Sequence, residues 1–460
     1  MNVRTMRVDE LKSGFDGVIV LPGDDAYESA RRIWNAMIDK RPAIIARCAS
    51  VGDVVRATNY ARENGLALAV RGGGHNIAGN AVCEDGLVID LTRMRNVRVD
   101  VAARRATVEG GATLADLDAA TQSHGLATPV GINSTTGIAG LALGGGFGWL
   151  SRKFGMTVDN LESAEVVTAD GRVVRASATE HPDLFWALRG GSGNFGVVTR
   201  FEFRLHPVGP DVLSGLVVYS AKDAKPALQR YRDFMAKAPE DLTVWSVLRL
   251  APPLPFLPAS VHGQPVVVFA AIYAGDPERG KALIEPLRHF GQPVGEHVGV
   301  QPYAAWQQAF DPLLTPGARN YWKSHNLTEL PDGLLDVVID YLGRLPSPQC
   351  EIFIAALGGA TALPAPESTA YAHRDAKFVL NVHGRWDDAA DDARGIGWAR
   401  EFFDASARYA SGGVYVNFMT ADESDRVRSA YGPNYPRLVE VKRKYDPQNL
   451  FSVNQNIRPA

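Results

Sequence analysis

The sequence predicts an α+β protein with more than one packing unit, and three observations carry this prediction. Segments with helical and with strand periodicity both occur along the chain, and the composition changes near residue 211. The chain has 460 residues, more than a single hydrophobic core usually organises. Hydrophobic residues make up 46% and charged residues 22%, which is typical of globular proteins and excludes a disordered or fibrous chain.

The first part of the chain is predicted to mix helices and strands. Val54, Thr58 and Ala61 recur at helical spacing in residues 51–64, and Gly65 ends this predicted helix. A predicted strand at residues 66–70 follows directly. The same reasoning predicts strands at 87–91, 107–109 and 197–205, helices at 114–123 and 183–189, and a hairpin at 164–177 that turns at Asp170 and Gly171.

A second region is predicted to begin at residue 211, where proline becomes frequent, as in PPLPFLP at residues 252–258. Amphipathic helices are expected at residues 223–238 and 332–344, and strands near 351–353, 377–385 and 414–419. A period of two places Asn381 and His383 on one face of their strand, and Tyr415 and Asn417 on one face of theirs. A solvated sheet face explains these polar faces as well as an active site does.

Charge, cysteine content and hydropathy limit which binding partners and which cellular location are compatible with the sequence. Lys and Arg number 48 against 51 Asp and Glu, so no basic field is available for a nucleic acid. No apolar run is long enough to cross a bilayer, and the first residues lack the apolar core of an export signal. The three scattered cysteines fit neither a disulfide framework nor a metal site. We expect a cytoplasmic protein with no membrane segment, nucleic acid or metal.

Several common motifs are missing or misplaced. GSGNFG at residues 191–196 matches the dinucleotide pattern GxGxxG, but it lies after a predicted helix and before a predicted strand, which reverses the required order. The HRD at residues 373–375 lacks the other parts of a kinase. The patterns GxxxxGK[ST], HExxH and GxSxG do not occur. Phosphoryl transfer, zinc proteolysis and nucleophile-elbow hydrolysis therefore lack their usual signatures.

Glycine is concentrated between residues 71 and 148, in triplets at 72–74 and 144–146. Such clusters favour positive φ angles or close approach of the backbone to a ligand, with tight turns as the alternative. The first triplet follows a predicted strand and ends at His75, so its N–H groups could bind a diphosphate beside an imidazole. A structural histidine is the alternative for His75 taken alone.

Four segments in this order resemble the FAD-linked oxidases of the berberine bridge enzyme type, in the vanillyl-alcohol oxidase superfamily. They are RGGGHN (71–76), GINSTTGIAGLALGGGFGWLSRKFGMTVDNL (131–161), DLFWALRGGSGNFGVVT (183–199) and YDPQNLFSVNQNIRP (445–459). The resemblance implies a PCMH-type FAD-binding domain of two α/β subdomains at residues 1–210. It also implies a substrate domain with an antiparallel sheet covered by helices at 211–411, and a C-terminal segment at 412–460 that returns to the FAD domain.

The resemblance further implies FAD attached covalently through His75 alone. Many members add a cysteinyl link in a GxCxxxG pattern, but Asn133 stands at that cysteine's position here, as in smaller bacterial members. The other residues that the resemblance places at the cofactor are Arg71, Gly72, Gly73, Gly74, Asn76, Gly79, Asn133, Ser134, Thr135, Thr136, Gly137, Gly140, Gly144, Gly146, Gly196, Val197, Asn454 and Asn456.

The resemblance places catalytic candidates on the sheet that roofs the flavin. Tyr415 and Asn417 form its Tyr-x-Asn pattern, and Tyr415 could share a proton near a cation. Glu351 is expected to be a buried base with a raised pKa, or to pair with a cationic amine. Expected pocket residues, each with a structural role as the alternative, are Lys323, Phe353, Asn381 and His383.

These residues lead us to expect an oxidase. It would take a hydride from an amine or alcohol carbon of a small or secondary-metabolite substrate to flavin N5 and return the electrons to O2, forming hydrogen peroxide. An amine is preferred because of Glu351 and the nicotine-oxidising members. The alternatives are a flavin dehydrogenase, an oxidative cyclase, or a ligand-sequestering resistance protein. Either a monomer or a homodimer is compatible with the sequence.

Overall fold

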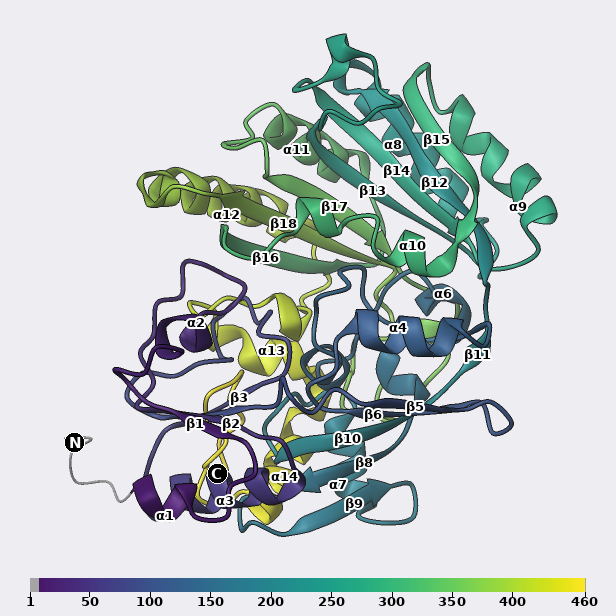
Figure 1. Cartoon of the computed structure of the whole chain (residues 1–460). Helices are drawn as coiled ribbons and strands as arrows, with labels where there is room; N and C mark the ends of the chain where they lie inside the picture. Colours follow the sequence, from purple (N-terminus) through teal and green to yellow (C-terminus); the bar gives the residue numbers. More distant parts are fainter. Residues whose placement is uncertain (1–7, 460) are drawn as a thin grey trace.

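The computed structural model describes residues 8–459, and it confirms the predicted α+β class. In Figure 1 one half of the molecule holds several small sheets, and a large sheet with helices on its outer side forms the other half. Residues 1–7 of the predicted first domain and residue 460 of the predicted C-terminal segment lie outside the described residues.

Three sheets form the first half. A four-stranded sheet has the order β1-β2-β4-β3, in which β2, β3 and β4 run parallel, and a five-stranded antiparallel sheet has the order β5-β6-β10-β8-β9. The pair β11-β7 completes this half. The strands are β1 (Val18–Val20), β2 (Ile44–Arg47), β3 (Leu68–Arg71), β4 (Leu87–Asp90), β5 (Val97–Asp100), β6 (Arg105–Glu109), β7 (Leu126–Ala127), β8 (Leu161–Val167), β9 (Val173–Ser177), β10 (Val197–Arg204) and β11 (His206–Pro207).

The helices of this half begin at local capping signals. Ser50 accepts a hydrogen bond from the backbone of Asp53 at the start of α3, and Thr113 and Asp116 form a capping box at α4. The helices are α1 (Val8–Lys12), α2 (Tyr27–Arg31), α3 (Val51–Glu63), α4 (Leu114–Gln122), α5 (Ile138–Leu143), α6 (Ser151–Phe154) and α7 (Pro182–Leu188). The predicted helices at 51–64, 114–123 and 183–189 therefore end within a residue or two of the observed ones.

The second half is a seven-stranded antiparallel sheet with the order β15-β12-β14-β13-β17-β18-β16. Its strands are β12 (Asp211–Ser220), β13 (Leu242–Leu250), β14 (Pro265–Tyr273), β15 (Pro293–Pro302), β16 (Arg319–Leu327), β17 (Glu351–Ala356) and β18 (Phe378–Trp386). The associated helices are α8 (Ala224–Met235), α9 (Pro277–Ile284), α10 (Tyr303–Gln307), α11 (Asp332–Leu342) and α12 (Asp392–Ser406).

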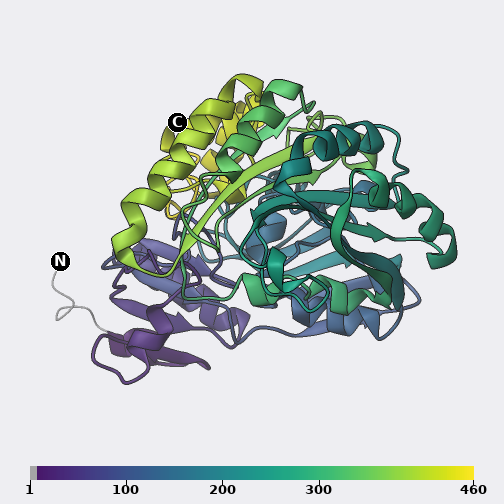
Figure 2. The same cartoon turned by 90° about the horizontal axis from the view of Figure 1, so that it is seen from above.

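Helices cover one face of this sheet and leave the other face toward the first half. Tyr231 of α8 stacks on Phe269 of β14, and Gly395 of α12 lies against Trp386 of β18. Figure 2 shows the helices lying across the outer side of the sheet. The side chains that alternate with these, such as Val268 and His383, point the other way. Period-two alternation therefore decides which side chains reach the space between the halves.

The chain then returns to the first half through α13 (Val427–Tyr431) and α14 (Tyr435–Tyr445), drawn in yellow in Figure 1. Leu438 and Ile457 pack in one core with Phe195 of the first half. The ammonium group of Lys442 is fully buried, pairs with Asp446 at 2.6 Å and donates to the carbonyl of Asn194 at 2.8 Å. This buried pair holds the C-terminal segment against the loop that precedes β10.

The predicted strand at residues 414–419 is wrong. Residues Val416–Phe418 form a 3-10 turn, η10, outside every sheet, so Tyr415 and Asn417 do not lie on the large sheet. The apolar and polar residues alternate here because this segment crosses between two buried surfaces, not because it forms a ladder of hydrogen bonds.

Candidate functional site

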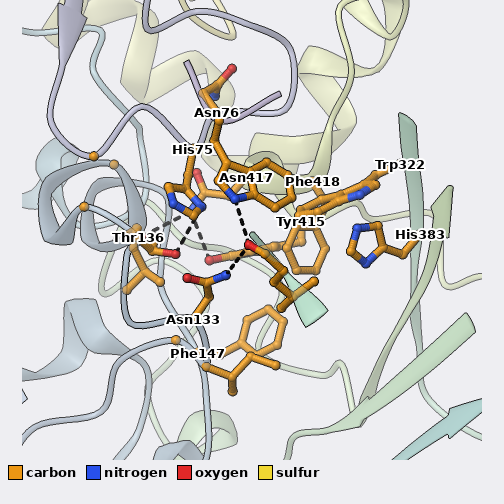
Figure 3. A pocket seen from close by; sticks show the side chains of 18 of the residues that line it. His75, Asn76, Asn133, Thr136, Phe147, Trp322, His383, Tyr415, Asn417 and Phe418 are labelled. Carbon is orange, nitrogen blue, oxygen red and sulfur yellow. Dashed lines mark hydrogen bonds between the residues drawn. The ribbon is translucent and has the colours of Figure 1, made fainter. Parts of the chain in front are cut away.

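One cavity lies between the two halves. Its lining comes from glycine loops of the first half, from the inward face of the large sheet, and from two segments near the C-terminus. In Figure 3, His75 and Thr136 lie on one side of this cavity, and Trp322 and His383 lie on the other. The cavity therefore brings together residues that are more than 300 positions apart in the sequence.

Two loops cross tightly to form the floor of the cavity. The loop after β3 brings Gly73 so close to Gly137 that a Cβ on Gly73 would lie 2.2 Å from the backbone nitrogen of Gly137. Any side chain at either position would push the loops apart. Gly74 has a φ of +73°, in the region that favours glycine. The first glycine triplet is thus required by a close backbone approach, and this approach places His75 at the cavity.

Contacts on both sides hold the imidazole of His75. It stacks on Trp34 with ring centroids 5.1 Å apart, and its Nε2 lies 2.9 Å from the hydroxyl oxygen of Thr135. The hydroxyl of Thr135 donates to Oδ1 of Asn133 at 2.7 Å, and the backbone N–H of Thr135 donates to the same oxygen. Because the Thr135 hydroxyl already donates its proton to Asn133, the hydroxyl oxygen accepts from Nε2 of His75. Nε2 therefore carries the imidazole hydrogen, and Nδ1 carries the lone pair.

Burial keeps this ring neutral. It lowers the pKa of His75 to about 3, so the imidazole holds no charge at neutral pH. The loop at residues 133–136, which contacts His75, is also tied to the second half. Asp311 accepts hydrogen bonds from the backbone N–H of Ser134 at 2.9 Å and from the Ser134 hydroxyl. A neutral imidazole with an unprotonated Nδ1, which the hydroxyl oxygen of Thr136 approaches to 3.4 Å, can act as a nucleophile toward a bound ligand.

A second end of the cavity is lined by the loop before β10 and by residues near the C-terminus. Ser192, Gly193, Gly196, Val197 and Asn454 line it. Asn454 donates to the carbonyls of Gly193 and Phe451, while its Oδ1 is buried without a partner among the described residues. A buried acceptor without a donor indicates that a ligand or water supplies one there. This narrow, glycine-lined end fits the extended part of a dinucleotide.

Tyr415 and Asn417 form a hydrogen-bonded pair beside the floor. The hydroxyl oxygen of Tyr415 accepts from the backbone N–H of Gly146 at 3.0 Å and from Nδ2 of Asn417 at 3.0 Å. Its own proton is therefore free to be donated to a ligand in the cavity. Burial raises the pKa of Tyr415 to about 12, against the effect of these two hydrogen bonds, so it acts as a donor at neutral pH. The condition for proton sharing is not met, since no cation contacts Tyr415 among the described residues.

The roof carries a charged group formed by Arg249, Glu351 and His383. These residues lie side by side on β13, β17 and β18, because Glu351 pairs with Arg249 on one side and with His383 on the other. Nη1 of Arg249 donates to Oε2 of Glu351 at 2.8 Å, and Nδ1 of His383 lies 3.3 Å from Oε1. All three line the cavity.

The expectation of a raised pKa for Glu351 is wrong. Burial alone would raise it, but the charge of Arg249 and the contact with His383 outweigh burial and lower the pKa of Glu351. Burial lowers the pKa of His383, and Glu351 opposes this only in part. At neutral pH the group therefore holds a cation, a carboxylate and a neutral imidazole, with no net charge.

The neutral imidazole of His383 has an open position for one proton. Its Nε2 lies 3.3 Å from Oδ1 of Asn320, an oxygen that already accepts from Arg385 at 3.2 Å. Its Nδ1 faces the carboxylate of Glu351, which also only accepts. One ring nitrogen of the neutral imidazole carries the hydrogen. The other nitrogen directs its lone pair at an oxygen atom, and no proton lies between the two atoms. The pair formed by Glu351 and His383 can therefore take up a proton released in the cavity.

Aromatic side chains enclose the space between floor and roof. Phe147 contacts Tyr415 at a ring-centroid distance of 4.8 Å, Trp245 stacks on Phe353 at 6.0 Å, and Trp322 meets His383 at 4.4 Å. Phe418 touches several of these rings, as the labelled residues in Figure 3 show. Edge and face contacts of this kind are typical of a pocket for planar groups.

The structure brings most of the predicted site residues together. Those that line the cavity are His75, Gly72, Gly73, Gly74, Asn76, Asn133, Thr136, Gly137, Gly140, Gly196, Val197, Asn454, Phe353, His383, Tyr415, Glu351 and Asn417. Several others do not line the cavity but contact residues close to it. Thr135 contacts His75, Ser134 contacts Asp311, and Gly146 contacts Tyr415. Gly144 lies against Asn417, and Gly79 against Ile38.

Four further predicted residues also lie outside the cavity lining. Lys323 points to the helix-covered face of β16 and pairs with Asp422 at 3.2 Å, and its neighbour Trp322 lines the cavity instead. Asn381 is fully buried on the inward face without a partner among the described residues, and Arg71 donates to the carbonyls of Ala30 and Ala81. Asn456 also stays outside the lining.

Sequence reasoning missed Trp34, Arg249 and Trp322. A period of two in LTVWSVLRL, the strand β13, would have placed Trp245, Val247 and Arg249 on one face. No local signal marks Trp34, because its role comes from packing against His75 across the fold.

Two negative findings apply to residues 8–459. No group of three or more His, Cys, Asp or Glu side chains is arranged to hold a metal ion. No helix in this range has the length and apolar character needed to cross a membrane.

Comparison with known proteins agrees with this geometry. Residues 42–177 match an FAD-binding domain, and residues 414–458 match the berberine and berberine-like family. The chain is 32% identical to an FAD-linked oxidoreductase of Dictyostelium discoideum, over 99% of this chain and 97% of that protein. The chain belongs to the berberine bridge enzyme-like family of FAD-linked oxidoreductases.

Two further comparisons, one of sequence and one of structure, extend over nearly the whole chain. The (R)-6-hydroxynicotine oxidase of Paenarthrobacter nicotinovorans is 32% identical over 96% of this chain and 97% of that protein. The crystal structure of 6-hydroxy-D-nicotine oxidase from Arthrobacter nicotinovorans superposes with a TM-score of 0.87 at 30% identity, covering 97% of this chain and 99% of that one. The berberine bridge enzyme-like chain described here is therefore an FAD-dependent oxidoreductase, and its cavity fits the cofactor.

Proposed function

We propose that this chain is an oxidase whose FAD is linked covalently through His75 alone. The observation that carries the proposal is one cavity with a neutral imidazole in its floor and a proton-accepting pair, Glu351 and His383, in its roof. Asn133 occupies the position of a possible second link and is engaged in holding Thr135. A flavin bound in this cavity would supply a hydride acceptor for a substrate carbon and a route for the electrons to O2, with hydrogen peroxide as the product.

The chain's own residues manage orientation and the proton. Tyr415 donates a hydrogen bond into the cavity, and Asn417 fixes its hydroxyl. The proton leaves the O–H or N–H group of the substrate as its C–H bond is oxidised, and the Glu351–His383 pair accepts it. The aromatic enclosure excludes water from the reacting atoms.

The substrate in this proposal is an uncharged alcohol or amine, of a small molecule or secondary metabolite. Arg249 already neutralises Glu351, so the carboxylate offers little net attraction to an ammonium group. This removes one reason for preferring an amine, while the nicotine oxidase relatives remain in its favour. Oxygen as acceptor is supported by the same relatives, which are named oxidases.

The domain limits 1–210, 211–411 and 412–460 are part of this proposal, supported by the sheets and by the shared core of the C-terminal segment. The three cysteines are buried and free, which supports the cytoplasm as the location. Either a monomer or a homodimer is compatible with this site, since one chain supplies both its floor and its roof.

Acid precipitation tests the covalent link. The yellow colour is expected to stay with the pellet for the natural protein and for the exposed-histidine control His124→Ala, and to be lost from the pellet of His75→Ala. Colour retained by His75→Ala would mean that another residue forms the link, and a colourless natural pellet would refute the link altogether.

Anaerobic flavin bleaching tests the chemistry. Glu351→Gln is expected to slow bleaching by alcohols or amines by about 10²- to 10⁴-fold, because the proton acceptor is weakened. The control Glu329→Gln removes an exposed carboxylate that does not line the cavity and should not change the rate. A ligand-sequestering protein would shift the flavin spectrum without bleaching, and unchanged bleaching in Glu351→Gln would exclude this residue as the acceptor.

A further inference from the structure

The roof of the cavity has two chemically different parts. On β16, β18 and β17 the inward side chains include Trp322, His383 and Glu351, and Arg249 on β13 closes this polar part. Beyond Arg249 the inward side chains are aliphatic on three successive strands. They are Val247 on β13, Val266 and Val268 on β14, and Leu216 and Val218 on β12, all of which line the same cavity.

The hairpin connection at residues 251–264 covers this aliphatic part. Leu254 and Leu257 of the connection line the cavity and pack with Val218, Val266 and Val268. The connection reaches across the sheet as far as β15, where Phe256 stacks on His297 with ring centroids 5.6 Å apart. A Cβ on Gly295 of β15 would lie 2.6 Å from Leu257, so the connection lies directly on the strand. The connection folds in short turns, in which the backbone N–H of Leu254 donates to the carbonyl of Pro252 and that of Leu257 donates to the carbonyl of Leu254.

The aliphatic part of the roof and the two leucines of the covering connection form a corridor that leads to the proton-accepting pair. It is defined here by Leu216, Val218, Val247, Val266, Val268, Leu254 and Leu257. Its side chains carry no polar atom, and Arg249, the charged group at its inner end, is satisfied by Glu351. Apolar surface that faces a cavity is stabilised by an apolar ligand and not by a polar one. From β13 to β12 the corridor crosses two strand spacings, or about 10 Å.

We propose that the substrate is an elongated, largely hydrocarbon molecule with one oxidisable hydroxyl or amine group at its end. The polar end lies at Glu351 and His383, and the hydrocarbon body lies along the corridor between β13, β14 and β12 and the covering connection. This inference rests on the proposed oxidation at that roof pair. It excludes sugars and short polar alcohols as good substrates, since they would leave the corridor filled with water.

Calorimetric titration of the purified, flavin-loaded protein with straight-chain primary alcohols and primary amines tests the corridor. For chains of about four to about ten carbons, Kd is expected to fall roughly fourfold for each added methylene, the gain from burying one CH2 group. Val268→Thr keeps the shape of the side chain and adds a hydroxyl, and it should weaken binding of the longest probe about tenfold while leaving the shortest unchanged. Val300→Thr, at a side chain 49% exposed on β15, is the matched control.

Binding and turnover separate the two proposals. A Kd that falls with chain length and responds to Val268→Thr supports the corridor even if no probe bleaches the flavin, in which case the proposed oxidation fails. Bleaching by probes whose Kd does not depend on length overturns the corridor and leaves the oxidation standing. Absence of binding by every probe also overturns the corridor.

Discussion

Asp118 is a buried carboxyl group whose ionisation is expected to weaken the contact between the two halves of the molecule. It lies on α4, is 2% exposed, and accepts from Nε2 of Gln307 on α10 at 3.1 Å. The same amide group donates to the carbonyl of Gly131, at the start of the loop that holds His75. Burial raises the pKa of Asp118 from 3.8 to about 7, and the hydrogen bond from Gln307 opposes this only in part.

The raised pKa of Asp118 fixes the sign and the size of the change in unfolding free energy with pH. The folded protein binds the proton more tightly than the unfolded chain, so the stabilisation is complete below pH 4 and is lost as the pH rises to about 7. Above that pH the loss amounts to about 4 kcal/mol of the free energy of unfolding. Asp118→Asn keeps the acceptor for Gln307 and removes the charge. Its stability relative to the natural protein should rise by about 3 kcal/mol between pH 5 and pH 8.5.

Urea unfolding at these two pH values measures the difference, with the exposed carboxylate variant Asp425→Asn as the control. The control should follow the natural protein at both pH values. A stability difference for Asp118→Asn that is the same at pH 5 and pH 8.5 would refute the reasoning, because it would show that Asp118 does not titrate between them in the folded protein.

Two other predictions concern the floor and the roof of the site. Gly73→Ala should abolish flavin binding, measured as the absorbance ratio of flavin to protein, because its Cβ would lie 2.2 Å from the backbone of Gly137; Gly397→Ala, with no atom within 4 Å of the added carbon, should bind normally. Equal flavin content in both variants would contradict the close approach. The rate of flavin reduction should stay constant as the pH falls from 8 to 7, because burial lowers the pKa of His383 from its usual value and its neutral form persists. A rate that already falls above pH 7 would show that His383 is not the neutral acceptor.

Much of the fold could be predicted because its signals are local. Helical spacing and a following glycine located α3, and the Asp170 and Gly171 turn located the hairpin β8-β9. Alternation placed Asn381 and His383 together on the inward face of β18. The error at residues 414–419 has the same origin, because alternation also occurs where a single turn passes between two buried surfaces.

Electrostatic properties of the site could not be predicted in this way. Glu351 was expected to have a raised pKa because a buried carboxylate alone would have one. Arg249 reverses the direction, and its position beside Glu351 depends on the pairing of β13 with β17, which are about 100 residues apart. The same holds for Tyr415, whose hydroxyl is oriented by Gly146 and Asn417.

By itself the sequence determined the family and located the glycine loop that carries His75, since both depend on glycines and motif order within short segments. Only the tertiary structure decided which side chains line the cavity and how they are charged. Strand pairing brought Arg249, Glu351 and His383 together, and packing of the connection at 251–264 enclosed the corridor. The physical reason is that pKa values and cavity shape depend on contacts between distant segments, which no local pattern encodes.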